Sequence, residues 1–468
     1  MIWSIVQVIG KQGTTLLTIT ILALFLNPTD FGILGMAMAW IAFIQIFSEL
    51  GFGAALIQRQ DLNSRYFSTI FFINVAAGIF LTLIGVSLSG PCAIFFKTPR
   101  VKPIMAVLSL GFAINSFSLT QVTLAQKELR FRDLAIRDIS AALIGGIAGI
   151  ISVILGFGVW SLVIQLLTAY LIGSILLWCM VKWRPIFREF SLQCAKELWP
   201  YSSKIFAFQI FKYFAQNIDK LIIGYFLGPV ALGLYTFAFR LVAYPVSTVV
   251  GAIGNYLFPK FSIMQNSLKE INKSYLFIVK AINAIVFPFL VMVGFLSPVF
   301  IPAIWGQKWI QAIPLIQIFA VLAIAGSFIS PVGQLMKALD RPGWLFIWSI
   351  YITVTIAIFV WLGVSFRGIL GGAFGITMAY ISGIPIIAYI VNKLLNVSYL
   401  DILKSLFPSI LSGLIMGLLV FGILNFKIFM DPMNVLVGTF SGALLYLICL
   451  ILFDKTFMVT IYRRLAKA

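Results

Sequence analysis

The sequence predicts an all-α polytopic membrane protein of about 14 transmembrane helices, arranged as two parallel six-helix repeats and two extra helices. Composition, the spacing of apolar segments and an internal repeat lead to this prediction. Of the 468 residues, 61% are hydrophobic and only 10% are charged, and the mean hydropathy is +1.07. A soluble chain averages about 45–50% apolar and about 25% charged residues. No water-soluble fold of this size could bury so much apolar surface, so the protein must fold in lipid.

Apolar segments that are long enough to cross a membrane follow one another along the chain. A helix needs about 20 apolar residues to cross the hydrocarbon core. The break at 156–158 is the weakest, so totals of about 12 or 13 spans stay open beside 14. The expected spans are 1–26, 31–57, 67–90, 103–125, 139–157, 159–181, 200–227, 230–258, 274–300, 310–335, 343–364, 368–392, 402–424 and 433–453.

The basic residues predict the orientation of these spans. With the N-terminus inside, most Lys and Arg of the loops lie on the cytoplasmic side, as the positive-inside rule requires. We therefore expect a multi-pass protein of the bacterial inner membrane with both termini in the cytoplasm. The same loop bias explains the net charge of +19 without nucleic acid as a partner. The expected external loops hold only six basic residues, Lys97, Arg100, Lys102, Lys308, Arg367 and Lys427.

A short pattern of turn residues occurs twice, 201 residues apart. The segment 25–28 (Phe-Leu-Asn-Pro), followed by Phe31-Gly32, recurs as 226–229 (Phe-Leu-Gly-Pro), followed by Leu232-Gly233. A repeat of six spans enters the membrane in the same orientation both times, which is the parallel-repeat plan of some secondary transporters. The predicted parts are an N-terminal lobe at 1–181, a cytoplasmic linker at 182–199, a C-terminal lobe at 200–392, and the extra helices with the tail at 393–468.

The same offset aligns Lys11 with Lys212, and both lie well inside a predicted span. A charged side chain at the bilayer centre costs about 2.5–3.5 kcal/mol, so such residues usually face the interior of the bundle. Polar residues three and four positions away extend each lysine into a stripe on one helix face, which predicts a polar cleft between the halves. The candidate substrate-binding residues are Lys11, Lys212, Arg240, Gln7, Gln209 and Gln216, with Trp40, Tyr213 and Tyr244 as rings that could stack on sugars.

Cations outnumber carboxylates in the first two helices of each half. Four cations there face two carboxylates, Glu49 and Asp219, so the cleft suits an anion such as a phosphate or pyrophosphate. Glu49, Asp219 and Lys220 are candidates for ion pairs or for coupling transport to an ion. Arg59 and Lys260, which the offset also pairs, are expected at the cytoplasmic mouth.

Each of these candidates has a structural alternative. Lys11 could snorkel to the cytoplasmic interface instead of facing a cleft. Asp219 and Lys220 could form structural ion pairs with other helices. Arg59 and Lys260 could be loop charges that serve topology alone, and the aromatic residues could face lipid or the core.

The residues that most enzymes and metal sites need are scarce. The chain has no histidine, and its four cysteines lie far apart. We therefore expect no metal site, no disulfide framework and no cofactor. A membrane polymerase or ligase would need acid–base residues in an external loop, and the expected external loops are too short to provide them. The prediction is a protein that is not an enzyme.

Three segments resemble the polysaccharide transporter family: 27–32 (Asn-Pro-Thr-Asp-Phe-Gly), 49–59 (Glu-Leu-Gly-Phe-Gly-Ala-Ala-Leu-Ile-Gln-Arg) and 217–224 (Asn-Ile-Asp-Lys-Leu-Ile-Ile-Gly). More narrowly, the chain looks like Wzx-type flippases of the colanic-acid exporter-like branch, within the multidrug/oligosaccharidyl-lipid/polysaccharide superfamily. The resemblance runs over nearly the whole chain.

This resemblance implies a V-shaped bundle that works by alternating access. It implies transfer of undecaprenyl-pyrophosphate-linked oligosaccharide repeat units from the cytoplasmic to the periplasmic leaflet, for exopolysaccharide, capsule or lipopolysaccharide O-antigen. It also implies that the lipid tail lies near 402–453. Membrane lipids and the polymerase and export machinery of the same pathway are the implied partners.

Two related transporters stay open as alternatives. A flippase for the peptidoglycan precursor would carry a substrate with the same lipid pyrophosphate. A multidrug exporter of the same superfamily would need buried carboxylates for organic cations, and the predicted cleft has few of them.

Overall fold

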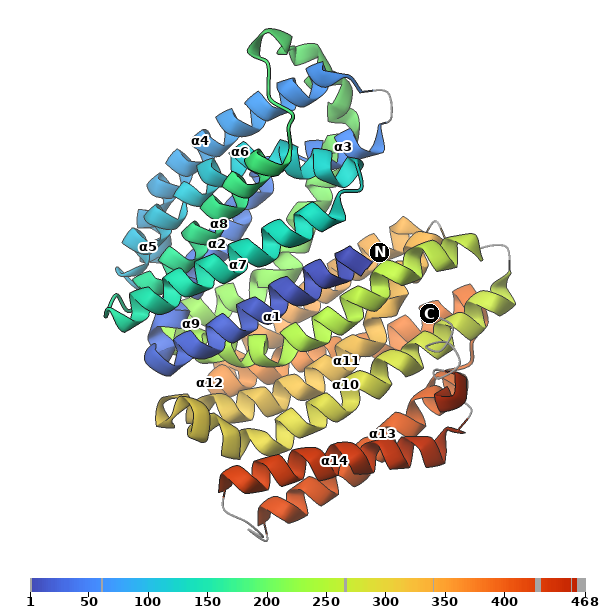
Figure 1. Ribbon diagram of the computed structural model, residues 1–468. Helices are drawn as coiled ribbons and strands as arrows, with labels where there is room; N and C mark the ends of the chain where they lie inside the picture. The colour runs from blue at the N-terminus through green and yellow to red at the C-terminus, as the bar shows by residue number, and fades with distance from the viewer. Residues whose placement is uncertain are drawn as a thin grey trace. The chain divides into compact units, whose positions relative to one another are not determined.

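Helices make up the structure (Figure 1). The computed structural model describes residues 2–59, 62–264, 267–339, 341–425, 431–455 and 457–460, and in these ranges it contains helices and no strand. Eleven helices within the described ranges are long and apolar enough to cross a membrane. The predicted all-α, multi-pass membrane fold is therefore confirmed.

The helices follow one another with short connections. Up to the middle of the chain they are α1 (Ile2–Phe25), α2 (Pro28–Glu49), α3 (Phe52–Gln58), α4 (Ser64–Phe95), α5 (Val101–Leu108), α6 (Leu110–Lys127), α7 (Phe131–Ile154), α8 (Trp160–Met180), the 3-10 helix η1 (Phe187–Glu189) and α9 (Leu192–Ile263). They continue with α10 (Leu268–Trp305), the 3-10 helix η2 (Gln307–Ala312), α11 (Ile313–Ala338), α12 (Pro342–Leu395), α13 (Tyr399–Asn425) and α14 (Asp431–Phe453).

Two of the long helices contain a break. In α9 it falls at Gly228, where φ is 78° and ψ is −171°. In α12 it falls at Arg367 and Gly368. The first break lies between the predicted spans 200–227 and 230–258, and the second lies at the start of the predicted span 368–392. The helices α9 and α12 therefore each correspond to two spans. The total of about 14 spans stays a prediction, and these breaks are consistent with it.

Helix α7 begins earlier than predicted. The apolar segment indicated a span from 139, but the helix begins at Phe131. Asp133 in its first turn accepts a 2.8 Å hydrogen bond from Nε of Arg130, and a carboxylate there also suits the positive end of the helix dipole. The extra turns carry Arg137 and Asp138 from an expected loop into the helix.

The described chain divides into two compact units, Met1–Thr236 and Phe237–Ala468. In the first unit α7 packs against α1 and α8, and α4 packs against α6. In the second unit α10 packs against α11 and α13, and α13 packs against α14. The lobe boundaries inferred from the sequence repeat, at 181, 200 and 392, remain a prediction.

The first unit contains a reciprocal contact between α2 and the start of the second part of α9. A methyl group on Gly32 would lie 1.7 Å from the carbonyl oxygen of Pro229, and one on Gly233 would lie 1.7 Å from that of Pro28. Both pairs are related by the 201-residue offset. A two-fold relation between equivalent segments produces reciprocal contacts of this kind, so the contact is consistent with the predicted repeat.

Candidate functional site

A polar cleft lies in the first unit, between α2, α3 and the part of α9 that precedes Gly228. Its volume is about 280 Å³, close to the lower end of the range for small-ligand pockets, which is about 300–1,000 Å³. We call it the amide cleft, because amide side chains dominate its polar lining. Its polar and aromatic lining residues are Gln45, Phe206, Gln209, Tyr213, Gln216 and Asn217.

The spacing of these residues explains why they meet. Gln209, Tyr213 and Gln216 are four and three positions apart, so they lie along one face of α9. Gln45 faces them from α2. Gly51 lies at one end of the cleft with a φ of 77°, and a methyl group on it would lie 2.4 Å from the carbonyl oxygen of Ser202. The backbone conformation and the close approach both require glycine there.

Hydrogen bonds hold the walls of the amide cleft. The Tyr213 hydroxyl donates to the carbonyl oxygen of Ala39 at 2.8 Å. Nε2 of Gln45 donates to Oγ of Ser48 at 2.7 Å, and Nδ2 of Asn217 donates to the Tyr213 carbonyl oxygen at 3.1 Å. A side-chain amide offers both donors and an acceptor, which is the pairing that sugar hydroxyl groups need, and a tyrosine ring adds an apolar face.

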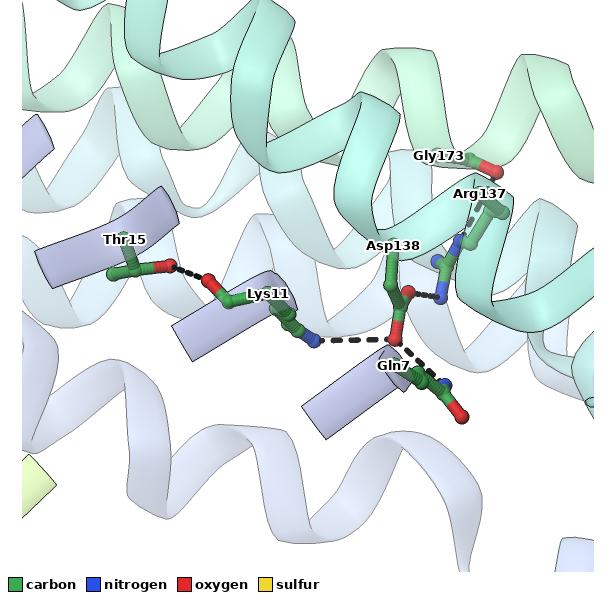
Figure 2. Close-up of polar contacts among 6 residues, drawn as sticks. All are labelled: Gln7, Lys11, Thr15, Arg137, Asp138 and Gly173. Carbon is green, nitrogen blue, oxygen red and sulfur yellow. Dashed lines mark hydrogen bonds and ion pairs between the residues drawn. The ribbon is translucent and has the colours of Figure 1, made fainter. Parts of the chain in front are cut away.

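Lys11 and Gln7 are not among the residues that line the amide cleft; they belong to a cluster on α1 and α7 (Figure 2). Nζ of Lys11 lies 3.6 Å from Oδ2 of Asp138, and Nε2 of Gln7 donates to the same oxygen at 2.9 Å. Arg137 donates from Nη1 to Oδ1 of Asp138 at 2.7 Å and from Nε to the carbonyl oxygen of Gly173 at 3.3 Å. Asp138 is buried, whereas 55% of the Lys11 side chain is exposed.

Sequence reasoning missed Asp138 and Arg137. An apolar window that begins at 139 leaves both in a loop, although Leu134 and Ala135 already continue the buried face of α7 toward its N-terminus. Helical spacing between that face and Asp138 was the signal that could have found it. The charge count from four helices therefore left out a carboxylate, and Lys11 is partnered instead of unpaired.

Asp219 and Lys220 are adjacent in sequence but have separate contacts. The Tyr235 hydroxyl donates to Oδ2 of Asp219 at 2.7 Å, and this carboxylate is buried. Nζ of Lys220 donates to the carbonyl oxygen of Gln216 at 2.7 Å and to Oδ1 of Asn217 at 3.1 Å. The bond from Tyr235 ties the two parts of α9 together across Gly228.

Arg59 lies in a polar cluster at the end of α3. Its Nη1 is 3.2 Å from Oε2 of Glu197, and the Tyr66 hydroxyl donates to the same oxygen at 2.5 Å. The hydrogen bonds from Tyr66 and from Arg59 hold the pKa of Glu197 below its usual value. Nζ of Lys127 donates to the carbonyl oxygen of Arg59 at 2.7 Å. These contacts fasten α3 to the start of α9 and to the end of α6.

The other candidate residues lie elsewhere. Trp40 packs edge-on against Phe95 of α4, with ring centroids 6.0 Å apart, and does not line the amide cleft. Arg240 is partly buried in the second unit. The described residues contain no group of three or more His, Cys, Asp or Glu that could hold a metal. Four side chains lie outside the part that the structure describes, those of Glu49, Lys212, Tyr244 and Lys260.

The second unit holds a buried ion pair between Lys280 of α10 and Asp454, which follows α14. Oδ1 of Asp454 accepts a 3.1 Å hydrogen bond from the backbone nitrogen of Phe457. Nζ of Lys280 lies over the Phe457 ring, 5.1 Å from its centroid. The pair joins the end of α14 to the bundle of this unit.

Proteins of polysaccharide biosynthesis resemble the chain over most of its length. Residues 21–314 match the family model described as polysaccharide biosynthesis protein. The teichuronic acid biosynthesis protein TuaB of Bacillus subtilis (strain 168) is 26% identical over 87% of this chain and 86% of its own length. The lipopolysaccharide biosynthesis protein WzxC of Escherichia coli (strain K12) is 24% identical over 87% of this chain and 81% of its own length.

Solved structures of transporters share the fold. The lipid II flippase MurJ in its inward closed conformation superposes with a TM-score of 0.78, at 14% identity, over 98% of this chain and 100% of that one. An inward-facing multidrug resistance MATE family transporter of the MOP superfamily has a TM-score of 0.68, at 16% identity, over 84% of this chain and 99% of that one. The likeness in fold and the match over more than half of the sequence agree: the chain belongs to the family of polysaccharide biosynthesis proteins.

Proposed function

We propose that this protein is a flippase that moves undecaprenyl-pyrophosphate-linked oligosaccharide repeat units from the cytoplasmic to the periplasmic leaflet of the bacterial inner membrane. The units would serve exopolysaccharide, capsule or lipopolysaccharide O-antigen synthesis. The amide cleft is the observation that carries the proposal. The Tyr213 hydroxyl joins α9 to α2, but a helix bundle in lipid has no structural need for a group of amide side chains around an open space. A glycan that crosses the membrane does need such groups, because they replace its water.

The cationic groups of the bundle would hold the pyrophosphate. Lys11 lies on α1 with 55% of its side chain exposed, and Lys212 and Arg240 occupy the related helices of the second half. Fixed cations lower the cost of bringing a phosphate anion into lipid. The amide cleft is too small for a whole repeat unit, so it would hold a few sugars while the rest of the cargo lies outside it.

Transport would proceed by alternating access with both termini in the cytoplasm. The membrane potential, negative inside, favours outward movement of an anion by about 2.3 kcal/mol per charge per 100 mV. Asp219 or Glu49 would couple an inward ion to this step. The protein would act with the polymerase and export machinery of its pathway and would bind neither nucleic acid nor a cofactor. It would perform no chemistry of its own.

The test is export in cells. Deleting the gene should remove surface polysaccharide and cause lipid-linked repeat units to accumulate inside. In the deletion strain, the double variant Lys11→Ala with Lys212→Ala should restore about one tenth of the export that the wild-type gene restores. The reason is that hydrogen bonds to charged groups contribute about 1.5–3 kcal/mol. Gln209→Leu with Gln216→Leu should also impair rescue. Lys102→Ala, which changes an exposed lysine of α5 outside the cleft, is the matched control and should rescue fully.

Each outcome discriminates among cargoes, provided that every variant reaches the membrane. Full rescue by the double lysine variant would remove the cationic headgroup site from the proposal. Normal polysaccharide after deletion, with rescue of a strain depleted of its peptidoglycan-precursor flippase, would assign that lipid as the cargo. Normal polysaccharide with new sensitivity to cationic drugs would favour a multidrug exporter.

A further inference from the structure

Asp138 is a buried carboxylate held from three sides within the first unit (Figure 2). Arg137 contacts Oδ1 at 2.7 Å, and Gln7 donates to Oδ2 at 2.9 Å. Both distances are those of good hydrogen bonds. Lys11 approaches Oδ2 only to 3.6 Å, which is too far for a hydrogen bond and leaves a charge–charge contact. Lys11 is therefore the weakest of the three partners.

The exposure of the side chains also marks Lys11 as the weakest partner of Asp138. Only 17% of the Arg137 side chain and 10% of the Asp138 side chain are exposed, against 55% for Lys11. If the Lys11 ammonium moved away, Asp138 would keep its arginine and its glutamine, so no buried charge would be left alone. If Arg137 moved, a largely buried guanidinium would lose its carboxylate. The cluster is built so that Lys11 is the partner that can leave at low cost.

We propose that Asp138 is the resident counter-ion of Lys11 and that an anionic group of the cargo displaces it, so that Lys11 alternates between the two anions. This inference rests on the proposed function, because it requires a cargo with a diphosphate or a similar anion. The carboxylate spares the empty transporter an unpaired ammonium in the membrane. It also competes for Lys11 when the cargo leaves, which weakens binding and favours release.

Binding of farnesyl diphosphate to the purified full chain in detergent tests this exchange, with farnesol as the uncharged reference. Asp138→Asn keeps the shape and frees Lys11 from competition, so affinity for the diphosphate should rise by about two- to fivefold, the modest size expected for a half-exposed pair. Asp133→Asn removes the same charge from the same helix, where the carboxylate pairs with Arg130, and should leave affinity unchanged.

A Lys11→Ala background identifies the route of the effect. There, Asp138→Asn should give a clearly smaller gain, because no ammonium remains to be released. An equal gain in affinity with and without Lys11 would mean that Asp138 simply repels the diphosphate. That result would overturn the exchange of anions at Lys11. If Asp138→Asn does not yield monodisperse protein, Gln7→Glu is the second variant, and it should lower the affinity for farnesyl diphosphate instead of raising it. It places a second carboxylate beside Lys11 and should weaken binding several-fold, and unchanged affinity would overturn the proposal.

The wild-type protein separates this inference from the proposed function. A clear preference for farnesyl diphosphate over farnesol that Asp138→Asn does not improve would overturn the counter-ion role and leave the anionic cargo intact. Equal binding of the two probes by the wild type would argue against the anionic cargo, and the exchange would fall with it.

Discussion

Lys280 and Asp454 are the clearest case in which single side chains stabilise this protein. Their side chains are 21% and 7% exposed, so both charges have lost most of their water. A buried ion pair gives little net stability compared with apolar residues, but removing one partner leaves the other charge uncompensated. A substitution of one partner should therefore lower the free energy of unfolding far more than a substitution of both.

Asp454→Ala should lower the free energy of unfolding by about 3 kcal/mol, at the low end for a buried pair that loses one partner, because Lys280 keeps a fifth of its side chain in contact with solvent. Thermal unfolding of the purified protein in detergent would measure the loss as a lower Tm. Lys280→Met together with Asp454→Leu should recover most of it. A double variant as unstable as the single one would mean that the pair stabilises the unit by more than charge compensation.

Helices α2 and α9 depend on glycine where they approach most closely. Gly32 and Gly233 each face a backbone carbonyl oxygen of the other helix, and a backbone cannot move aside as a flexible side chain can. Side chains at these positions would push the helices apart along their length. The amide cleft lies between α2 and the part of α9 that precedes Gly228, so a shift of α2 away from the later part of α9 would also move one wall of the cleft.

Gly32→Ala should therefore destabilise the protein by about 1–3 kcal/mol or more, the usual cost of overpacking, and should reduce export as well. Gly13→Ala in α1 is the matched control. Apart from its own helix backbone and chain neighbours, nothing lies within 4 Å of a methyl group at Gly13, so alanine there should stabilise the helix by about 0.5–1 kcal/mol through backbone entropy. Tm values of the two variants should move in opposite directions, and a shift in the same direction would contradict the close approach at Gly32.

The whole chain carries a charge asymmetry that predicts its orientation in the membrane. Lys and Arg are concentrated in the connections that the positive-inside rule places in the cytoplasm, including the segment around η1. This arrangement would put the amide cleft, which is bounded by Gly51 and Ala54 near the end of α2, toward the cytoplasmic side. The proposed cargo is loaded from that side.

Cysteine labelling in spheroplasts tests this orientation. With the exposed native Cys179 replaced by serine, Lys102→Cys should react with a membrane-impermeant maleimide, because α5 begins on the predicted external side. Arg188→Cys in η1 should react only after the membrane is opened. The reverse pattern would invert the topology and, with it, the direction of transport.

The sequence by itself determined the class of fold and the family. Lipid demands long apolar helices, and 20-residue apolar segments leave a signal that needs no tertiary information. It also placed Gln209 and Gln216 on one face of a helix, because helical spacing is local, and it named Tyr213 as a ring that could stack on sugars. The 201-residue offset pointed to Gly32 and Gly233 without revealing that they face each other's helices.

Only the tertiary structure decided which polar groups are partners. Asp138 lies 127 residues after Lys11 in the sequence, and no local pattern links two residues that meet because α7 packs against α1. The same holds for Tyr235 with Asp219 across the break in α9, and for Lys280 with Asp454. Hydrophobic periodicity shows which residues avoid lipid, whereas the pairing of buried charges depends on which helices touch, and packing of the whole bundle sets that.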